Sequence, residues 1–446
     1  MLPIIIFGDN IMHSNSTVGK SDPLDATYKK ITWRLLPYLF IAYVFAYLDR
    51  VNIGFAAVQM KADLNFTDAV YGLGAGVFFI GYFMCEIPSN LLMNKIGARL
   101  TIARIMICWG LVSSCMMLVT SPTSFYLLRL LLGIFEAGFA PGVLLYLTLW
   151  YPPARRAQMA AIFLSGAAVA GLIGAPISGW MLDALDEYAG LHGWQWLFML
   201  EGIPSVFLGL MALVMLPDRP GAASWLTPEE KNRIKAELVT GQSTAHHGFI
   251  DALRDPVIYY IALAWFTVIC GIYAVAFWMP MLMQDAGIKT STQIGLWSII
   301  PYGFAAIGMV LISRHSDKVM ERRWHAATCA LLGALGLGLL PFVHDNFFLT
   351  MAALTLASTA VFSAMPITLA MPMCYLSGKA APGGIAFVNT IGLLGGVASP
   401  YMLGLIKTNT GSLDNGLFLI AALLVIGSLL VVGFVRLEPQ NKPVVV

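Results

Sequence analysis

Charge is the scarcest feature of this sequence. Asp, Glu, Lys and Arg together make up 11% of its 446 residues, whereas 58% are hydrophobic and the mean hydropathy is +0.77. Soluble globular domains carry about 25% charged residues, so the composition excludes a soluble domain and indicates a membrane protein. The net charge of +2 gives no indication of nucleic-acid binding.

Motifs for chemistry are also missing. The six cysteines show no CxxC spacing and all fall in apolar stretches, so we predict reduced packing residues rather than metal ligands or disulfides. The sequence contains no phosphate-binding glycine loop and no nucleophile beside a base. None of the seven histidines falls in the middle of an apolar stretch. We therefore predict neither an enzyme nor a bound cofactor or metal ion.

What the sequence does contain is long apolar runs. Twelve of them suit a bilayer crossing, which takes about 20 residues, and they predict an all-α membrane protein. We expect transmembrane helices over 33–59, 70–93, 100–120, 123–149, 157–182, 194–216, 256–284, 291–313, 324–343, 346–376, 381–406 and 413–436.

A polar segment separates the first six runs from the last six. Within it, Thr227 and Glu230 fit a capping box, which predicts a capped amphipathic helix near 225–238 on the membrane surface. The expected organisation is a disordered cytoplasmic tail (1–30), an N-terminal bundle (31–216), a cytoplasmic linker (217–255), a C-terminal bundle (256–437) and a second cytoplasmic tail (438–446).

The two halves are related by an internal repeat. At an offset of 223 to 224 residues, Arg155 corresponds to Lys379 and Pro176 to Pro400. Such repeats are the sequence sign of transporters built from two related bundles with a site near mid-membrane between them. We therefore expect two pseudo-symmetric six-helix bundles that operate by alternating access.

The distribution of positive charge predicts the orientation. With the N-terminus inside, 21 of the 26 Lys and Arg residues fall in cytoplasmic segments. Only Lys61, Lys289 and Lys407 lie outside, and Arg50 and Arg129 lie within the membrane. Positive residues are retained on the cytoplasmic side. We therefore expect a multi-pass protein of the cell membrane with both termini in the cytoplasm.

Four intramembrane charges mark the candidate site: Asp49, Arg50, Arg129 and Glu136. A charge at this depth costs about 2.5 to 3.5 kcal/mol on insertion scales, so it persists when it is paired, solvated or used. Arg129, Gly133 and Glu136 share one helix face. Carboxylates near a cation can exchange protons, and a guanidinium binds a carboxylate through a bidentate fork. One alternative is that Asp49 and Arg129 only neutralise each other; Glu136 has no obvious helical partner.

The chain resembles a known family in four stretches: YLDRVNIGFA at 47–56, FFIGYFMCEIPSNLL at 78–92, LRLLLGIFEAGFAPGVLLYLTLWYP at 128–152 and GWQWLFMLEGIP at 193–204. They are similar to the anion:cation symporters of the major facilitator superfamily, in particular the bacterial phthalate, tartrate and sugar-acid permease branch. The resemblance implies proton-coupled uptake of a small organic anion across the bacterial inner membrane.

The resemblance also assigns roles to the four charges. It implies proton coupling by Asp49 and Glu136 and anion binding by Arg50 and Arg129. Side chains at matching depth are candidates for the rest of the pocket, and we expect the protein to act as a monomer without a cofactor. The further candidate pocket residues are Tyr47, Tyr82, Tyr273, Trp278 and Asn389.

The superfamily's loop signature is degenerate after the second helix, where its usual Asp is missing, and better kept after the eighth. We predict that both copies latch helices together rather than bind substrate. Glu201, in the sixth helix, could join a proton relay, but we favour a structural role for it. The latch candidates are Asn94, Lys95, Arg99, Asp317, Lys318 and Arg322.

Two rival functions stay open. The glycines around Pro176 are faintly similar to a motif of drug and proton antiporters, which would export a small molecule. A nutrient sensor on a transporter scaffold is the other. The sequence does not choose among aromatic carboxylates, sugar acids and dicarboxylates, and the pairing of carboxylates with arginines favours protons over sodium as the coupling ion.

Overall fold

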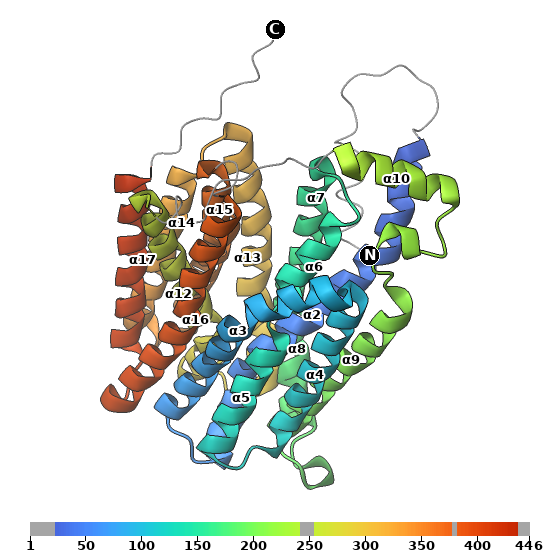
Figure 1. Cartoon of the computed structure of the whole chain (residues 1–446). Helices are drawn as coiled ribbons and strands as arrows, with labels where there is room; N and C mark the ends of the chain where they lie inside the picture. Colours follow the sequence, from blue (N-terminus) through green and yellow to red (C-terminus); the bar gives the residue numbers. More distant parts are fainter. Residues whose placement is uncertain (1–22, 241–253, 377–380, 436–446) are drawn as a thin grey trace.

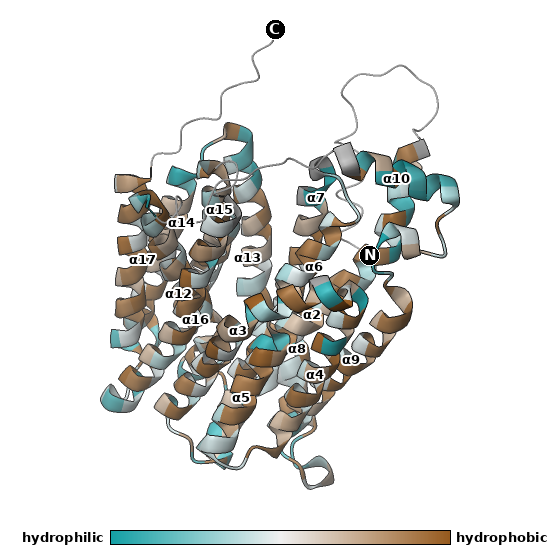
Figure 2. Cartoon of the chain, viewed as in Figure 1, coloured by the Kyte–Doolittle hydropathy of each residue, from teal (hydrophilic) through white to brown (hydrophobic). Residues whose placement is uncertain are grey.

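A computed structural model describes residues 23–240, 254–376 and 381–435, and within these ranges all regular structure is helical. Twelve helical spans are long and apolar enough to cross a membrane, which confirms the predicted fold class. Figure 1 shows the spans packed side by side, and Figure 2 shows how hydrophobic residues cover most of their length.

The first six spans form one bundle and the last six the other (Figure 1). Corresponding helices of the two bundles begin at the offset of the internal repeat, since the first residues of α3 and α13 are 223 residues apart. The first bundle comprises α2 (Pro23–Asp63), α3 (Asp68–Ile96), α4 (Ala98–Cys115), α5 (Pro122–Glu136) with α6 (Phe139–Thr148), α7 (Pro153–Leu164) with α8 (Gly166–Ala184), and α9 (Gly193–Met215). The second comprises α12 (Pro256–Asp285), α13 (Ser291–Val319), α14 (Arg323–Val343), α15 (Phe347–Tyr375), α16 (Ala381–Thr410) and α17 (Asp414–Phe434).

The first helix begins ten residues earlier than its apolar run. Residues 23–30, predicted to belong to a disordered tail, are the first turns of α2, so the predicted tail boundary is wrong. These turns are held by contacts that hydropathy does not report: Tyr28 stacks on Tyr151 with ring centroids 5.9 Å apart, and Lys30 pairs with Glu230 at 3.0 Å. Residues 1–22 and the predicted tail at 438–446 lie outside the described residues.

The linker helix α10 (Pro228–Thr240) is capped as predicted. The backbone N–H of Glu230 donates to Thr227 Oγ1 at 3.2 Å, and Glu230 Oε2 accepts from the Thr227 N–H at 2.8 Å. This backbone hydrogen bond, together with Lys30, holds the pKa of Glu230 below its usual value. We call the end of the molecule where α2 begins and α10 lies the α10 end, and the opposite end, with the α2–α3 and α4–α5 connections, the hairpin end (Figure 1).

The fourth span is interrupted, although one continuous helix over 123–149 was predicted. Helix α5 ends at Glu136, Ala137 leaves the helical region with ψ 130°, and Gly138 adopts φ +86°. A Cβ at residue 138 would approach Ser89 Oγ to 2.7 Å, so both the conformation and the space require glycine. The break leaves Glu136 as the last residue of α5.

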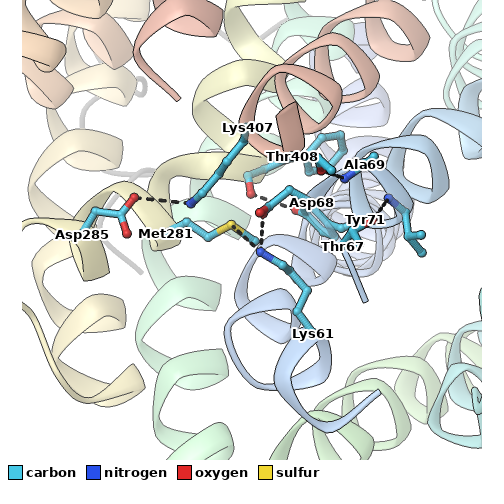
Figure 3. A network of polar contacts seen from close by, with 11 residues as sticks. Lys61, Thr67, Asp68, Ala69, Tyr71, Met281, Asp285, Lys407 and Thr408 are labelled. Carbon is cyan, nitrogen blue, oxygen red and sulfur yellow. Dashed lines mark hydrogen bonds and ion pairs between the residues drawn. The ribbon is translucent and has the colours of Figure 1, made fainter. Parts of the chain in front are cut away.

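At the hairpin end the two bundles are joined. Figure 3 shows Lys61 and Asp68 as an ion pair beside Met281, and the Ala69 N–H donates to Thr408 Oγ1 at 2.8 Å. A second junction links α8 to α13, where Asp183 Oδ2 accepts from the Thr292 N–H at 2.6 Å. These contacts close the hairpin end between the bundles.

Glycines allow the same junction to pack backbone against backbone. A Cβ on Gly72 of α3 would collide with the carbonyl oxygen of Pro400, and one on Gly404 of α16 with that of Asp68. Small residues at such crossings let membrane helices approach closely.

Gly72→Ala is therefore expected to disfavour closure at the hairpin end. Forcing a methyl group into a packed contact costs about 1–3 kcal/mol, which would raise the population of molecules open at this end. Spin labels at the exposed residues Glu187 and Lys289 should report a longer distance in the variant. Gly433→Ala is the matched control, because its Cβ would meet nothing within 4 Å; equal distances in both variants and the parent would contradict the expectation.

The predicted latch residues lie at the α10 end in two clusters. One cluster lies between α3 and α4 in the first bundle, and the other lies between α13 and α14 in the second. The Arg99 N–H donates to Asp218 Oδ1 at 2.9 Å, beside Gly97 at φ +90°. Asp218, which follows α9, thereby supplies an acidic group to the loop that lacks its usual Asp. In the second cluster Arg322 Nη2 donates to Asp317 Oδ1 at 2.8 Å.

The other latch candidates make no described contact of this kind. Lys95 and Lys318 are exposed, and the side chain of Asn94 lies outside the described residues. A latching role for the six residues stays a prediction.

Candidate functional site

The centre of the candidate site is an ion pair between α2 and α5. Arg50 donates to Glu136 Oε1 from Nε at 3.1 Å and also from Nη2. The Glu136 side chain is 1% exposed, whereas that of Arg50 is 13% exposed. Glu136 Oε2 is buried and has no hydrogen-bond partner. The carboxylate is therefore held by one cation through one oxygen, and the cation is the more accessible partner.

Aromatic rings of α3 flank the guanidinium of Arg50. Its Cζ lies 5.3 Å from the ring centroid of Tyr82 and 5.5 Å from that of Phe78. Such contacts stabilise a cation by about 0.5 to 2 kcal/mol. They help to fix the position of Arg50, and they use none of its N–H donors.

Arg129 also lies over the ring of Phe78, and its described hydrogen bonds go to backbone carbonyls. Its Nε donates to the Gly74 carbonyl at 3.2 Å and its Nη2 to the Ala75 carbonyl at 3.3 Å, while Cζ lies 5.0 Å from the Phe78 ring centroid. Arg129 is fully buried, and its Nη1 has no partner. One donor therefore stays available, in a setting without an acidic partner in hydrogen-bond contact.

Asp49 occupies a separate polar cluster. Its carboxylate accepts hydrogen bonds from Trp109 Nε1 at 2.9 Å, Ser113 Oγ at 2.8 Å and Ser205 Oγ at 2.9 Å. Trp109 is donor only, but each serine hydroxyl can also accept. If Asp49 took up a proton, a serine could turn from donor to acceptor, and the cluster would stay hydrogen-bonded in both states.

The four charged residues thus lie in two separate sites. Asp49 is in one, and Arg50, Arg129 and Glu136 are in the other. Asp49 and Arg50 are adjacent on α2, and consecutive helix residues point about 100° apart, so one faces α4 and α9 and the other faces α3 and α5. The alternative that Asp49 and Arg129 neutralise each other is wrong, because neither contacts the other. The partner of Glu136, not evident from its own helix, is Arg50.

Two further predicted residues join the site. Tyr82 contacts Arg50 directly, and Tyr273 of α12 lies within side-chain hydrogen-bonding reach of the same guanidinium, with its ring centroid 4.5 Å from that of Phe79. Phe79 in turn lies 4.9 Å from Phe78. A continuous aromatic path therefore runs from Arg50 in the first bundle to the second bundle.

The other predicted pocket residues are not brought to Arg50 by a described contact. Tyr47 is buried one turn before Arg50 on α2. Trp278 is fully buried and meets Tyr71 edge to face at 5.3 Å, in the seam between α3 and α12. Asn389 is half-buried on α16 and makes no hydrogen bond to another described residue.

Several contacts were invisible to sequence reasoning. Phe78 looks like any apolar residue in an apolar helix. Trp109 with Ser113 on α4, and Glu201 with Ser205 on α9, are spaced by four residues and so share a helix face, which was a usable but weak signal.

Comparison with known proteins agrees with this architecture. The sequence profile of the Major Facilitator Superfamily matches residues 39–400 and 289–445. The crystal structure of a D-xylose-proton symporter superposes with a TM-score of 0.74 over 92% of this chain and 98% of the other, at 16% identity, which is a likeness of fold.

Relatives by sequence span nearly the whole chain. The metabolite transport protein named NicT of Pseudomonas putida is 42% identical over 94% of this chain and 98% of its own length. A protein named for tartrate transport in Agrobacterium vitis is 43% identical over 94% and 97%. The quinolone resistance transporter of Acinetobacter baumannii is 39% identical over 94% and 97%. These matches confirm the predicted resemblance to bacterial permeases, and none of these relatives is named as an enzyme.

Proposed function

Because the chain belongs to the Major Facilitator Superfamily, we propose that it is a secondary transporter that takes up a small organic anion together with protons. The observation that carries the proposal is the ion pair of Arg50 with Glu136, in which the acid has one unpartnered oxygen. The relative named for tartrate supports an anionic cargo, as does the pairing of Arg50 with Glu136 within the membrane-spanning helices.

The coupling follows from competition for Arg50. While Glu136 is ionised, it occupies the Nε and Nη2 donors of Arg50. Protonation of Glu136 removes the charge that holds this contact and frees the guanidinium for a substrate carboxylate. Conversely, a carboxylate that displaces Glu136 leaves a buried acid without a cation, and burial without a partner favours the protonated form. Anion and proton therefore bind together.

The other site residues complete this cycle. Arg129 adds its unpartnered Nη1 and a second positive charge beside Phe78. Asp49 takes up a further proton within its hydroxyl cluster, linked to Arg50 through the shared backbone of α2. Tyr47, Tyr82 and Tyr273 shape the pocket, whereas Trp278 helps to close the hairpin end.

We propose that the α10 end faces the cytoplasm and that the protein lies in the bacterial inner membrane. Support comes from the sequence, in which 21 of the 26 Lys and Arg residues fall in predicted cytoplasmic segments, and from Lys61, Lys289 and Lys407, which fall in or next to the connections at the hairpin end. The structure then represents a state closed to the outside. Alternating access requires the contacts between the bundles at the hairpin end to break and the α10 end to close. We propose that a single subunit carries out this cycle.

Asp49→Asn is expected to abolish uphill accumulation while leaving substrate counterflow intact. The amide keeps an acceptor for Trp109 and a donor for a serine oxygen, so the cluster of three partners survives but no longer titrates. Radiolabelled uptake under an imposed pH gradient and exchange without one separate the two activities. Full accumulation in the variant would reduce Asp49 to a structural residue.

The proposed function is tested in proteoliposomes that contain the purified protein and a pH dye. Aromatic carboxylates, hexonates and dicarboxylates, tartrate among them, are added outside one at a time. Internal acidification with one class establishes proton symport and names the cargo. A flat trace with every anion, together with thermal stabilisation by one of them, would instead indicate uncoupled exchange or a sensor.

The likeness to the quinolone resistance transporter supports a second candidate, proton-driven export. The same assay distinguishes it, because an antiporter given its cargo outside releases protons from the vesicle and alkalinises the interior. An anionic cargo with acidification would rule out this candidate.

A further inference from the structure

A further polar cluster lies between α2, α8 and α9. It is distinct from the Arg50–Glu136 pair and from the hydrogen-bond partners of Asp49. Glu201 of α9 is 3% exposed; its Oε1 accepts from Ser178 Oγ of α8 at 2.7 Å, and its Oε2 has no partner. Asn52 of α2 is 1% exposed, and neither its Oδ1 nor its Nδ2 has a hydrogen-bond partner. An amide and an acid left unsatisfied in an apolar interior need an explanation.

A small cavity adjoins these groups. Asn52 and Ser178 line it, together with Gly171 and Gly174 of α8 and Tyr302 of α13. The space open to the centre of a water molecule is about 10 Å³, close to what a single water needs. A water there can accept from Asn52 Nδ2. Glu201 does not line the cavity, but its carboxyl group lies within side-chain hydrogen-bonding reach of Asn52.

No described basic side chain pairs with Glu201. The titratable groups around it are Asp49 on α2 and Tyr302, which lines the cavity; α8 presents the Ser178 hydroxyl, and Trp109 and Ser113 of α4 are already bound to Asp49. A buried carboxylate with an acid rather than a cation nearby is most stable with a proton on it.

We propose that Glu201, Asn52 and Ser178 form a second proton-binding site, beside a cavity in which one water can bind the Asn52 amide. In this arrangement Glu201 Oε1 accepts from Ser178, and the proton on Oε2 is donated to the Asn52 amide oxygen. No described hydrogen bond or ion pair joins this site to Arg50.

The wall of the cavity makes the site sensitive to the state of the bundles. Asn52 and Ser178 belong to the first bundle, but Tyr302 comes from the second, packed on Gly171. Glu201 lies eight residues into α9, about 12 Å from its hairpin end. When the hairpin junctions part, Tyr302 withdraws with α13 and the proton on Glu201 becomes accessible from the hairpin end.

Infrared spectroscopy of the purified, full-length protein tests the site without any substrate. At neutral pH the wild type should show a protonated-carboxyl band that is lost in Glu201→Gln and retained in Glu136→Gln. If Glu201→Gln does not fold, Asn52→Ala provides the second test, because loss of the amide partner should shift the same band. Wild-type and variant spectra that coincide in this region would overturn the proposal.

Exchange in D₂O tests the gate. The band should exchange at least several-fold faster in Gly72→Ala and in Tyr302→Ala than in wild type, and at the wild-type rate in Gly433→Ala. Equal rates in all four proteins would overturn the role of Tyr302. The inference rests on the proposed function only in that this proton would take part in coupled transport. The infrared assay measures no transport, so a negative result there would not count against anion symport. Conversely, a failure to find symport would leave the infrared band of Glu201 in place.

Discussion

Glu136→Gln is expected to lose uphill accumulation of the anion and to keep counterflow. Gln has the shape of Glu and can still accept from Arg50, but it carries no charge to release and takes up no proton. A gradient of one pH unit is worth about 1.4 kcal/mol, or tenfold accumulation, for each coupled proton. The variant should forfeit this factor for the proton that Glu136 carries.

The measurement is radiolabelled uptake into proteoliposomes, first with an imposed pH gradient and then as exchange against preloaded anion. Glu229→Gln is the matched control, since the same change is made on the exposed first turn of α10 and should leave both activities as in the parent. Undiminished accumulation by Glu136→Gln would remove this acid from the coupling mechanism.

Arg50→Lys is expected to weaken anion binding by about 2 kcal/mol, or roughly thirtyfold, because a hydrogen bond to a charged group contributes about 1.5–3 kcal/mol. Lysine keeps the positive charge, but it lacks the planar fork that can serve Glu136 and a substrate carboxylate at once. It also loses the cation–π contacts that the flat guanidinium makes with Phe78 and Tyr82. Counterflow and accumulation should both fall, unlike in Glu136→Gln.

Affinity is measured by calorimetry or by thermal stabilisation with the anion found in the pH-dye assay. Arg34→Lys serves as the control: Arg34 also lies over an aromatic ring, 5.8 Å from the centroid of Trp225, but near the start of α2 and far along the chain from Glu136. If both variants bind as tightly as the parent, Arg50 is not the anion site.

Sequence reasoning predicted the fold well because hydrophobic length is a strong signal in membranes. It placed twelve spans and the capped helix α10. It missed the early start of α2 because those turns are stabilised by specific partners, Tyr151 and Glu230, rather than by lipid. It also missed the break after Glu136, since a glycine at φ +86° has no signature that distinguishes it from the many other glycines.

For the candidate site, sequence identified the charged residues but not their partners. Periodicity orders residues along one helix, whereas the pairing of Arg50 with Glu136 joins two helices and depends on how α2 rotates against α5. The same limit applies to Asp49, whose three donors come from α4 and α9. Glu201 was assigned a structural role because its unpartnered oxygen and the adjacent cavity exist only in the packed bundle.

The central claim is that an anion binds Arg50 while a proton binds Glu136, so that the two bind together. It is tested most directly by counting protons on anion binding. The anion is added to purified protein in weakly buffered detergent solution, and the pH of the medium is followed alongside bound anion. The account predicts proton uptake with each anion bound by the wild type, and its loss in Glu136→Gln, which still binds. Anion binding by the wild type without proton uptake, or equal uptake by Glu136→Gln, would contradict it.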